Sequence, residues 1–473
     1  MKNEELKKYI QNQLLHSKDR LEGYIRDVNG KVFHKRSAYF VLENHINSFI
    51  NGKNEPRIIV MPGLRGTGKT TLLAQLYFHA QAEKLYLSVD EIVKRFDVTL
   101  WDAIECYEEL VGSAVEEFKK PFFLFLDEVH YDKKWSAFLK TLYDKSKNVF
   151  VLCTGSASLL LKDQINADLS RRVKLVDIFP INFHEYEMIK DNILLPENLS
   201  ENIANALLSS DNAEKLFKEL KKEEGRVKKY WLQIDRFEIK KYMKFGTLPF
   251  TIQSENEALS NEYIGQMIDK IISFDLPLLG RFEVETISKV ERILYLISDS
   301  ISVSLTHLSC AVEMRKETLS SVLMALCKAG VLIRVAPHGS HYSQVRKPSK
   351  YLFATPAFRS FFLNSLDSSK LLDDYQGSLF EDLAVLCFQR FIPKYGDFSL
   401  SYDSSDGGAD FILGFPRKKI AIEVAAGNKG IKQALFTMDK KKCDYGVIFC
   451  SEELYFDKEQ NIVKVPWQYV LLV

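Results

Sequence analysis

The sequence predicts an α/β fold in which a parallel sheet carries a phosphate-binding loop, and three observations indicate this. An apolar run, Ile58–Met61, leads into Gly63–Thr70, which fits the pattern G-x-x-x-x-G-K-[ST]. Two further apolar runs, 122–126 and 149–153, are short and uninterrupted, as in strands buried on both faces. Both runs end in polar residues, and ligands of open α/β sheets bind at the carboxyl ends of the strands. We therefore expect a nucleotide site at that edge of the sheet.

The composition is that of a globular protein with several domains. Its 473 residues predict about three domains, and 46% of them are hydrophobic, enough for several cores. The net charge of +1 is too small for the whole protein to attract a polyanion electrostatically, so a nucleic-acid site must be a local basic patch. Seven cysteines without a C-x-x-C pair predict reduced thiols and a cytoplasmic protein rather than a zinc or disulfide framework. No stretch has the roughly 20 apolar residues of a membrane span.

A helical segment, residues 1–55, is expected to precede the sheet. It begins with a charged helix rather than a signal peptide, and residues 51–56 form a stop signal that contains glycine and proline. We expect this segment to pack near the nucleotide base. The basic run 34–36 is read as a solvated face.

The loop itself has the residues that phosphate binding requires. Its glycines allow backbone N–H groups to converge on phosphate oxygens, and the following helix directs its positive end at the same anion. Lys69 is expected to reach the β- and γ-phosphates, and the Thr70 hydroxyl to bind Mg²⁺. The predicted cofactors are therefore ATP and Mg²⁺; the alternative is a glycine-rich turn with an exposed lysine. The predicted nucleotide-binding residues are Gly63, Leu64, Arg65, Gly66, Thr67, Gly68, Lys69, Thr70 and Thr71.

Polar residues end the two later strands. Asp127 and Glu128 match a Walker B pair, in which Asp127 holds Mg²⁺ through water and Glu128 polarises the attacking water; the alternative is an acidic strand-end cap. The next strand ends at Thr154-Gly155-Ser156. Thr154 or Ser156 is expected to act as a polar sensor. An N-cap for a helix over residues 158–162 is an equally weighted alternative, and both roles can hold together.

These pieces, followed by 168–172 and 179–186, resemble in order and spacing the bacterial and archaeal AAA+-like ATPases close to the STAND group, which carry a nuclease-like C-terminal domain. In that family, residues 169–172 read L-x-G-R and residues 180–186 belong to a P-L-S-F-x-E-[FY] signature. Here Arg171 replaces the glycine and Arg172 aligns with the family arginine. The resemblance implies that Arg171 or Arg172 contacts the γ-phosphate, in its own site or in that of a neighbour, as a finger or sensor. The alternative is a solvated basic pair.

The resemblance assigns residues 56–187 to an AAA+-like ATPase core. Residues 188–282 are charged and helical, and we interpret them as a helical lid or insertion with a solvated charged face. Gly246-Thr247-Leu248-Pro249 resembles the G-G-x-P motif of the family's lid, with one glycine missing.

Residues 283–365 are expected to form a winged helix. Helical patterns over 288–297, 304–311 and 315–330 precede two short strand patterns, 331–335 and 351–353. A recognition helix that starts with Arg315 and Lys316, together with the basic wing tip 338–350, suits phosphate contacts. DNA contact and internal structural use are both open.

The tail, residues 366–473, resembles the PD-(D/E)XK nuclease fold. The resemblance implies a metal site at Asp410 and Glu423, with Glu381 and Gln433 as further nuclease-like residues. An active member has a lysine two residues after the glutamate, and this chain has Ala425 there. Lys429 and Lys432 are the lysines close enough in sequence to replace it. We favour a degenerate fold that binds without cutting.

The predicted function is that of an ATPase switch, whose nucleotide state is coupled to DNA binding by the winged helix and the tail. The expected partners are ATP, DNA and further copies of the chain, without a membrane. One alternative is an ATP-gated DNA endonuclease. Another is a STAND-like signalling ATPase that oligomerises on a trigger and does not contact DNA.

Overall fold

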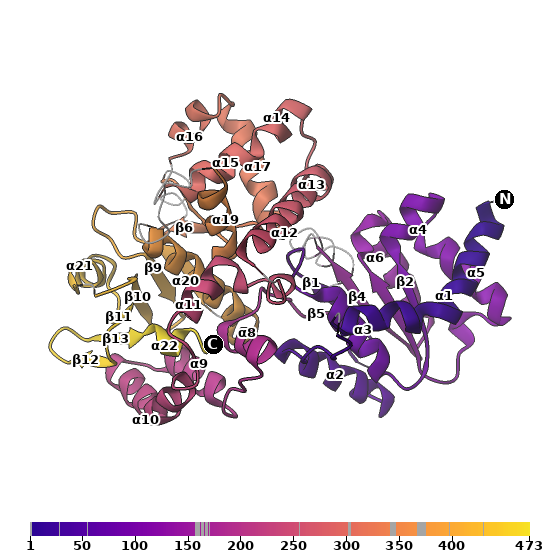
Figure 1. Ribbon diagram of the computed structural model, residues 1–473, viewed down its shortest axis with the longest axis horizontal. Coiled ribbons are helices and arrows are strands. Elements are labelled where there is room, and N and C mark those ends of the chain that lie inside the picture. Colours follow the sequence, from indigo (N-terminus) through magenta and orange to yellow (C-terminus); the bar gives the residue numbers. More distant parts are fainter. Residues whose placement is uncertain are drawn as a thin grey trace. The chain divides into compact units, whose positions relative to one another are not determined.

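The chain folds into two compact units in the computed structural model (Figure 1). The first contains residues 1–179 and the short segment 328–330, and the second contains residues 180–327 and 331–473. The described residues are 2–27, 29–53, 55–156, 161, 165, 169, 171–254, 256–300, 304–340, 347–366, 375–396, 398–428 and 430–473. None of the helices formed by these residues is long and apolar enough to cross a membrane.

The first unit contains a five-stranded sheet in which every pair of neighbouring strands is parallel. Its strand order is β2-β3-β4-β1-β5. The strands are β1 (Ile58–Pro62), β2 (Glu83–Ser88), β3 (Phe122–Asp127), β4 (Val149–Gly155) and β5 (Val173–Leu175). The predicted parallel sheet is therefore confirmed. Strand β5 was not predicted, because three residues are too few to show an apolar period.

Helices cover both faces of this sheet. They are α1 (Lys2–Ile25), α2 (Ser37–Ile50), α3 (Lys69–His79), α4 (Val89–Phe96), α5 (Leu100–Val111) and α6 (Trp135–Lys145). Because successive strand residues point to opposite faces, Ile59 and Phe125 pack against α2 and α3, whereas Val60 and Leu126 pack in the core with α4, α5 and α6. Helix α1 contacts α5, α3 and β2. Both faces of β3 are buried, as its continuous apolar run predicts.

The second unit begins with helices. They are α8 (Phe183–Asp191), α9 (Leu199–Ser209), α10 (Ala213–Trp231), α11 (Glu238–Lys241), α12 (Glu257–Lys270), α13 (Leu276–Leu279), α14 (Val284–Ser288), α15 (Val290–Ser298), α16 (Leu305–Ala311) and α17 (Lys316–Lys328). The signature residue Asn182 caps α8 by accepting a hydrogen bond from the Glu185 N–H at 2.9 Å. Tyr186 packs on Gly246, where a Cβ would lie 2.7 Å from its ring. The two motifs thus meet inside one helical core.

An eight-stranded mixed sheet completes the second unit, in the order β12-β13-β11-β10-β9-β8-β6-β7. Its strands are β6 (Leu332–Pro337), β7 (Lys350–Phe353), β8 (Ser399–Tyr402), β9 (Phe411–Gly414), β10 (Lys419–Val424), β11 (Tyr445–Cys450), β12 (Tyr455–Asp457) and β13 (Ile462–Pro466). The helices of this part are α19 (Pro356–Leu366), α20 (Gln376–Tyr395), α21 (Lys432–Lys441) and α22 (Trp467–Val470).

The β6–β7 hairpin belongs to this sheet. Strand β6 pairs antiparallel with β7 and parallel with β8, where Ala336 lies opposite Ser401. The sheet therefore runs across the predicted boundary at residue 365, and the winged helix and the nuclease-like fold stay predictions. The middle of the predicted wing tip, residues 341–346, lies outside the described part of the chain.

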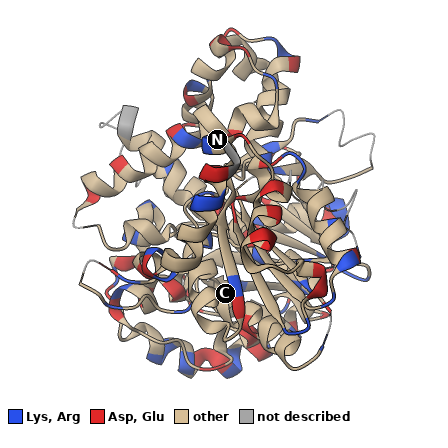
Figure 2. Cartoon of the chain, turned by 90° about the vertical axis from the view of Figure 1, so that its right-hand side faces the viewer, with Lys and Arg blue, Asp and Glu red and all other residues tan. Residues whose placement is uncertain are grey.

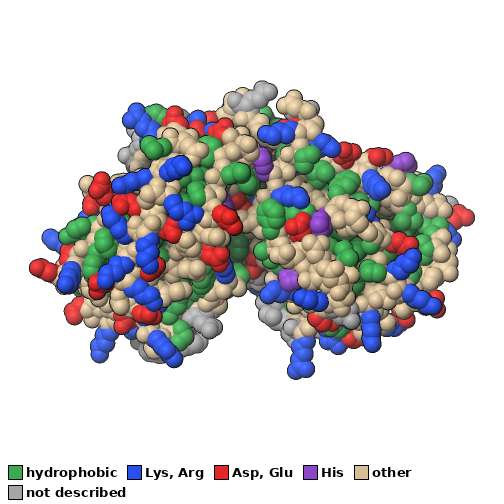
Figure 3. Space-filling model, turned by 90° about the horizontal axis from the view of Figure 1, so that it is seen from below, with side chains coloured by type: hydrophobic (Ala, Val, Ile, Leu, Met, Phe, Trp, Pro, Cys, Tyr) green, Lys and Arg blue, Asp and Glu red, His purple; other side chains and the backbone are tan. Residues whose placement is uncertain are grey.

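Charges of both signs are interspersed over the surfaces that the figures show. Segments with Lys or Arg and segments with Asp or Glu both occur in many parts of the cartoon in Figure 2, and apolar side chains lie between charged ones in Figure 3. This agrees with a net charge of +1. A nucleic-acid site would have to be formed by a few residues.

Candidate functional site

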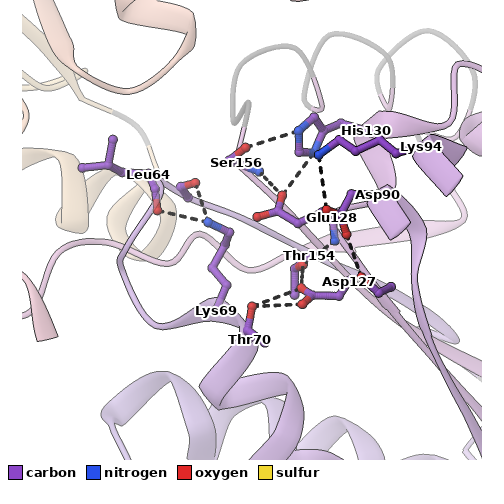
Figure 4. Close-up of polar contacts among 12 residues, drawn as sticks. Leu64, Lys69, Thr70, Asp90, Lys94, Asp127, Glu128, His130, Thr154 and Ser156 are labelled. Atoms are coloured by element: carbon purple, nitrogen blue, oxygen red, sulfur yellow. Dashed lines mark hydrogen bonds and ion pairs between the residues drawn. The ribbon is translucent and has the colours of Figure 1, made fainter. Parts of the chain in front are cut away.

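The loop between β1 and α3 has the backbone that its glycines predict. Gly66 and Gly68 have φ values of 77° and 84°, in the left-handed region that glycine adopts without steric cost. Gly63 lies so close to the segment after β5 that a Cβ would be 2.3 Å from the Ile178 carbonyl oxygen. The Lys69 ammonium donates to the Gly63 and Leu64 carbonyls, each at 3.0 Å (Figure 4). Lys69 is thus held at the mouth of the loop, whereas Arg65 and Thr71 are half-buried beside it.

Arg36 supports the loop, which corrects the interpretation of residues 34–36 as a solvated basic face. Arg36 is 8% exposed, and its guanidinium donates to the Thr67 carbonyl at 2.7 Å and to the Phe179 carbonyl at 2.9 Å. The Thr67 hydroxyl donates to the Leu64 carbonyl at 2.8 Å. The sequence carried no signal for this role, because the loop carbonyls lie about 30 residues away along the chain.

Three hydroxyl groups surround the buried carboxylate of Asp127. The Thr70 hydroxyl lies 3.0 Å from Oδ2, and the Tyr86 hydroxyl lies 3.4 Å from the same oxygen. The Thr154 hydroxyl contacts Oδ1. Burial, followed by the neighbouring charge of Glu128, raises the pKa of Asp127 to about 6, against the opposing hydrogen bonds and Lys69. The site thus joins the loop helix to the ends of β3 and β4.

Thr154 has two partners. Its Oγ1 also accepts a hydrogen bond from the Glu128 backbone N–H at 2.9 Å. The residue is fully buried, so its hydroxyl holds both members of the predicted Walker B pair in place. The N-cap alternative concerns residues 158–162, of which only Leu161 lies within the described residues.

Glu128, His130 and Ser156 form a second cluster at the same edge (Figure 4). Glu128 has a left-handed backbone with φ 56°, and its Oε2 accepts from the Ser156 N–H at 3.1 Å. His130 Nδ1 lies 3.3 Å from that oxygen, and Nε2 lies 3.3 Å from the Ser156 hydroxyl. The Ser156 N–H therefore orients the Glu128 carboxylate, and the His130 ring lies beside it. No role was predicted for His130, although it follows Glu128 by only two residues.

The residues at this edge fit a nucleotide with Mg²⁺. Backbone N–H groups of a glycine-rich turn and a helix N-terminus suit phosphate, and Lys69 supplies a positive charge. The Thr70 hydroxyl and the Asp127 carboxylate, 3.0 Å apart, are the hard oxygen donors that Mg²⁺ prefers. Thr70 and Asp127 would hold the ion.

The two predicted arginines lie elsewhere in the unit. Arg172 precedes Val173, the first residue of β5, which pairs with Ile58 at the start of β1. The strand β1 is five residues long, so at 3.3 Å per residue Arg172 is about 15 Å from the phosphate-binding loop. Its guanidinium pairs with Asp144 at 2.9 Å, and Arg171 beside it is exposed. Neither arginine lies at the loop of its own chain.

In the second unit, the structure brings together two of the predicted tail residues and a lysine. Lys350 contacts Glu381 and lies 3.7 Å from Asp410 Oδ1. Burial lowers the pKa of Lys350, but pairing with these two carboxylates outweighs burial and holds this pKa above the usual lysine value. Lys350 is 9% exposed, so its expected place in a basic wing surface is wrong.

Of the other predicted tail residues, Glu423 lies next to Asp410 on the neighbouring strand, because Ile422 of β10 pairs with Phe411 of β9. Glu423 is fully buried on β10, and Gln433 is half-buried on α21. Among the described residues, no three Asp, Glu, His or Cys side chains are arranged to hold a metal ion. Lys432 is exposed, and Lys429 lies outside the described part of the chain.

Comparisons with known proteins indicate which type of domain contains the parallel sheet of the first unit. The family model described as an AAA domain matches residues 55–187. The chain is 34% identical over 449 residues to the uncharacterized protein MJ1637 of Methanocaldococcus jannaschii, and the match covers 93% of this chain and 89% of that protein. It is 25% identical over 240 residues to the uncharacterized protein MJ1544 of the same organism, with 50% and 45% of the two chains covered.

Among solved structures, the RuvB Holliday junction branch migration motor from Thermotoga maritima is 16% identical, and the match covers 66% of this chain and 93% of that chain. Its TM-score of 0.30 is too low to support an argument. The family match and the parallel sheet together identify residues 55–187 as an AAA-type P-loop ATPase domain.

Proposed function

This chain belongs to the family that includes MJ1637 of Methanocaldococcus jannaschii, and we propose that it is an ATP-hydrolysing switch protein. The observation that carries the proposal is the contact of Thr70 with Asp127 and of Asp127 with Thr154. It unites the loop, the Walker B carboxylate and the next strand end in one site. Such a site serves phosphate transfer from a nucleotide to water.

Each residue then has a defined role. The Lys69 ammonium exchanges its two loop carbonyls for the β- and γ-phosphate oxygens of ATP. Thr70 and Asp127 hold Mg²⁺, which neutralises phosphate charge when bound. Glu128, oriented by the Ser156 N–H, polarises the attacking water. Thr154 holds Asp127 and the Glu128 backbone at fixed positions.

The test separates binding from turnover. Lys69→Ala should abolish the thermal stabilisation by ATP, which is about 2.7 kcal/mol at a hundredfold excess over Kd. Glu128→Gln should keep that stabilisation and lose hydrolysis by about 10²- to 10⁴-fold. Lys147→Ala, an exposed lysine in the same unit, is the matched control. Hydrolysis at the wild-type rate in both site variants would refute the proposal.

We further propose that Arg171 or Arg172 acts in a neighbouring copy of the chain. The distance of about 15 Å along β1 supports this, because neither arginine can reach the loop of its own chain. Hydrolysis per chain should then rise with protein concentration. It should also fall in Arg171→Ala or Arg172→Ala at concentrations where copies associate. A rate per chain that is independent of concentration would contradict this assignment.

As the output of the switch, we propose DNA contact through the start of α17. Arg315 and Lys316 are exposed there, next to a helix N-terminus that suits phosphate. Fluorescence anisotropy with a DNA duplex at low salt should show binding that weakens in an Arg315→Ala, Lys316→Ala double variant. Absence of binding at low salt would favour a signalling ATPase that does not touch DNA.

A further inference from the structure

The ion pair between Lys350 and Glu381 lies where the tail was expected to hold a metal. Asp410, which precedes β9, is 3.7 Å from the same ammonium through Oδ1. The other oxygen, Oδ2, accepts from the Val424 N–H at the end of β10, at 2.9 Å. The side chains of Lys350, Glu381 and Asp410 are 9%, 11% and 17% exposed. The ammonium is thus shared by two largely buried carboxylates.

The position of the motif lysine is apolar. Ala425 packs in a hydrophobic cluster with Ala434 and Ile448. The fold resemblance implies a divalent cation beside Asp410 and Glu423, with a lysine next to it. The residues present do not fit that group, because the motif lysine is missing and the described acidic residues do not form a three-ligand set. A cation already faces Asp410, namely the ammonium of Lys350.

The same strand is fastened to the same helix a second time. At the other end of β7, the Phe353 N–H donates to Asp382 at 2.9 Å. Arg359 of α19 binds Asp382 through two guanidinium nitrogens, at 2.6 and 3.0 Å. Two successive carboxylates of α20, Glu381 and Asp382, therefore hold both ends of β7.

The ammonium of Lys350 affects whether the carboxylates of Glu381 and Asp410 can bind another cation. A buried carboxylate needs a counter-charge, and a positive charge close to it disfavours a second cation at the same oxygens. Removing one member of a buried pair leaves the remaining charges uncompensated. Glu381 and Asp410 would then have to take up a proton or another cation.

We propose that the ammonium of Lys350 replaces the metal ion of the tail. The Lys350–Glu381–Asp410 group is a metal-independent lock that holds the β6–β7 hairpin on α20 and β9, and it is not a hydrolytic centre.

The test is Mn²⁺ binding to the full chain without nucleotide, measured from the electron paramagnetic resonance of free Mn²⁺. Wild type and Asp410→Asn should bind the same number of ions. Lys350→Met should bind one more than wild type, and Lys350→Met with Asp410→Asn should lose it again. Ions bound near Thr70 and Asp127 are common to all four proteins and cancel in the comparison. Lys350→Arg keeps the charge and should gain no ion.

The matched control is Lys347→Met, because Lys347 lies next to the same strand and donates to the Ser404 hydroxyl instead of a carboxylate. The thermal stability of Lys350→Met should fall without Mn²⁺ and recover with it, whereas the control should not respond. Loss of a bound Mn²⁺ in Asp410→Asn alone would overturn the proposal, and this comparison does not require Lys350→Met to fold. Plasmid cleavage by the wild type with Mn²⁺, abolished in Asp410→Asn and Lys350→Met, would make Lys350 a nuclease residue instead. If Lys350→Met folds and does not bind an additional Mn²⁺ ion, the proposal that Lys350 replaces a metal ion is also contradicted.

Discussion

At the residue scale, the ATPase site depends on hydroxyl groups that hold carboxylates. Asp127 receives contacts from Thr70, Tyr86 and Thr154, which belong to α3, β2 and β4. A carboxylate buried beside Glu128 would otherwise favour its protonated form, as the raised pKa of Asp127 indicates. These hydroxyls support the charged form that a metal ligand requires.

Thr154→Val is the sharpest test at this scale. Valine keeps the volume but removes the hydrogen bond to Asp127 and leaves the Glu128 N–H without its acceptor, which costs about 1–3 kcal/mol. We expect ATP hydrolysis to fall by about 5- to 150-fold if this cost applies in the transition state, because about 1.4 kcal/mol corresponds to a factor of ten. Half-maximal rate should also require more Mg²⁺. Thr154→Ser keeps the hydroxyl and should remain close to wild type; an equal loss in both variants would show that the methyl group matters instead.

At the element scale, α20 organises the second unit. Its residue Asp382 is fully buried and binds Arg359, which is 1% exposed and also donates to the Ser298 carbonyl of α15 at 2.9 Å. Strand β7 and helices α15, α19 and α20 thus share one polar centre. The part predicted as a winged helix and the part predicted as nuclease-like are joined through it.

Arg359→Met should therefore destabilise the second unit by about 3–5 kcal/mol, because it leaves the Asp382 carboxylate buried without its partner. The measurement is urea denaturation. Lys394→Met is the control, since Lys394 pairs with Glu201 at the surface, where a pair contributes about 0–1 kcal/mol. Adding Asp382→Leu to Arg359→Met should recover part of the loss. Equal losses of stability in Arg359→Met and Lys394→Met would show that the buried ion pair contributes no more than the surface pair.

At the scale of the whole molecule, stability should depend on pH through Glu187 of α8. Glu187 is 1% exposed, its Oε1 accepts no hydrogen bond among the described residues, and burial raises its pKa to about 7. The folded chain keeps this proton where the unfolded chain, with a pKa near 4.5, has lost it. The free energy of unfolding therefore falls as the pH rises from about 4.5 to 7, by up to about 3 kcal/mol for this group.

Glu187→Gln should remove that loss, so that the difference from wild type grows with pH across this window. Urea denaturation at several pH values measures it. Glu453→Gln, an exposed glutamate of the same unit, should leave the profile of the wild type unchanged. The same slope in Glu187→Gln and wild type would assign the pH dependence to other groups.

The phosphate-binding loop, the carboxylate pair and the parallel sheet around them could be predicted from the amino-acid sequence alone. These features depend on residues that are contiguous: a buried strand, a glycine turn and a helix start follow one another over 58–79, and β3 runs directly into Asp127 and Glu128. Local chemistry and apolar period therefore predict them.

The partners of these groups could not be predicted in this way, because they depend on how the chain folds. Arg36 reaches Thr67, Thr154 reaches Asp127, and Lys350 reaches Asp410, across 31, 27 and 60 residues of sequence. The position of Arg172 also depends on the fold. Arg172 lies away from the loop because Val173, at the start of β5, pairs with Ile58 at the start of β1. Spacing along the chain carries no information on such contacts, because strand pairing and helix packing bring these residues together.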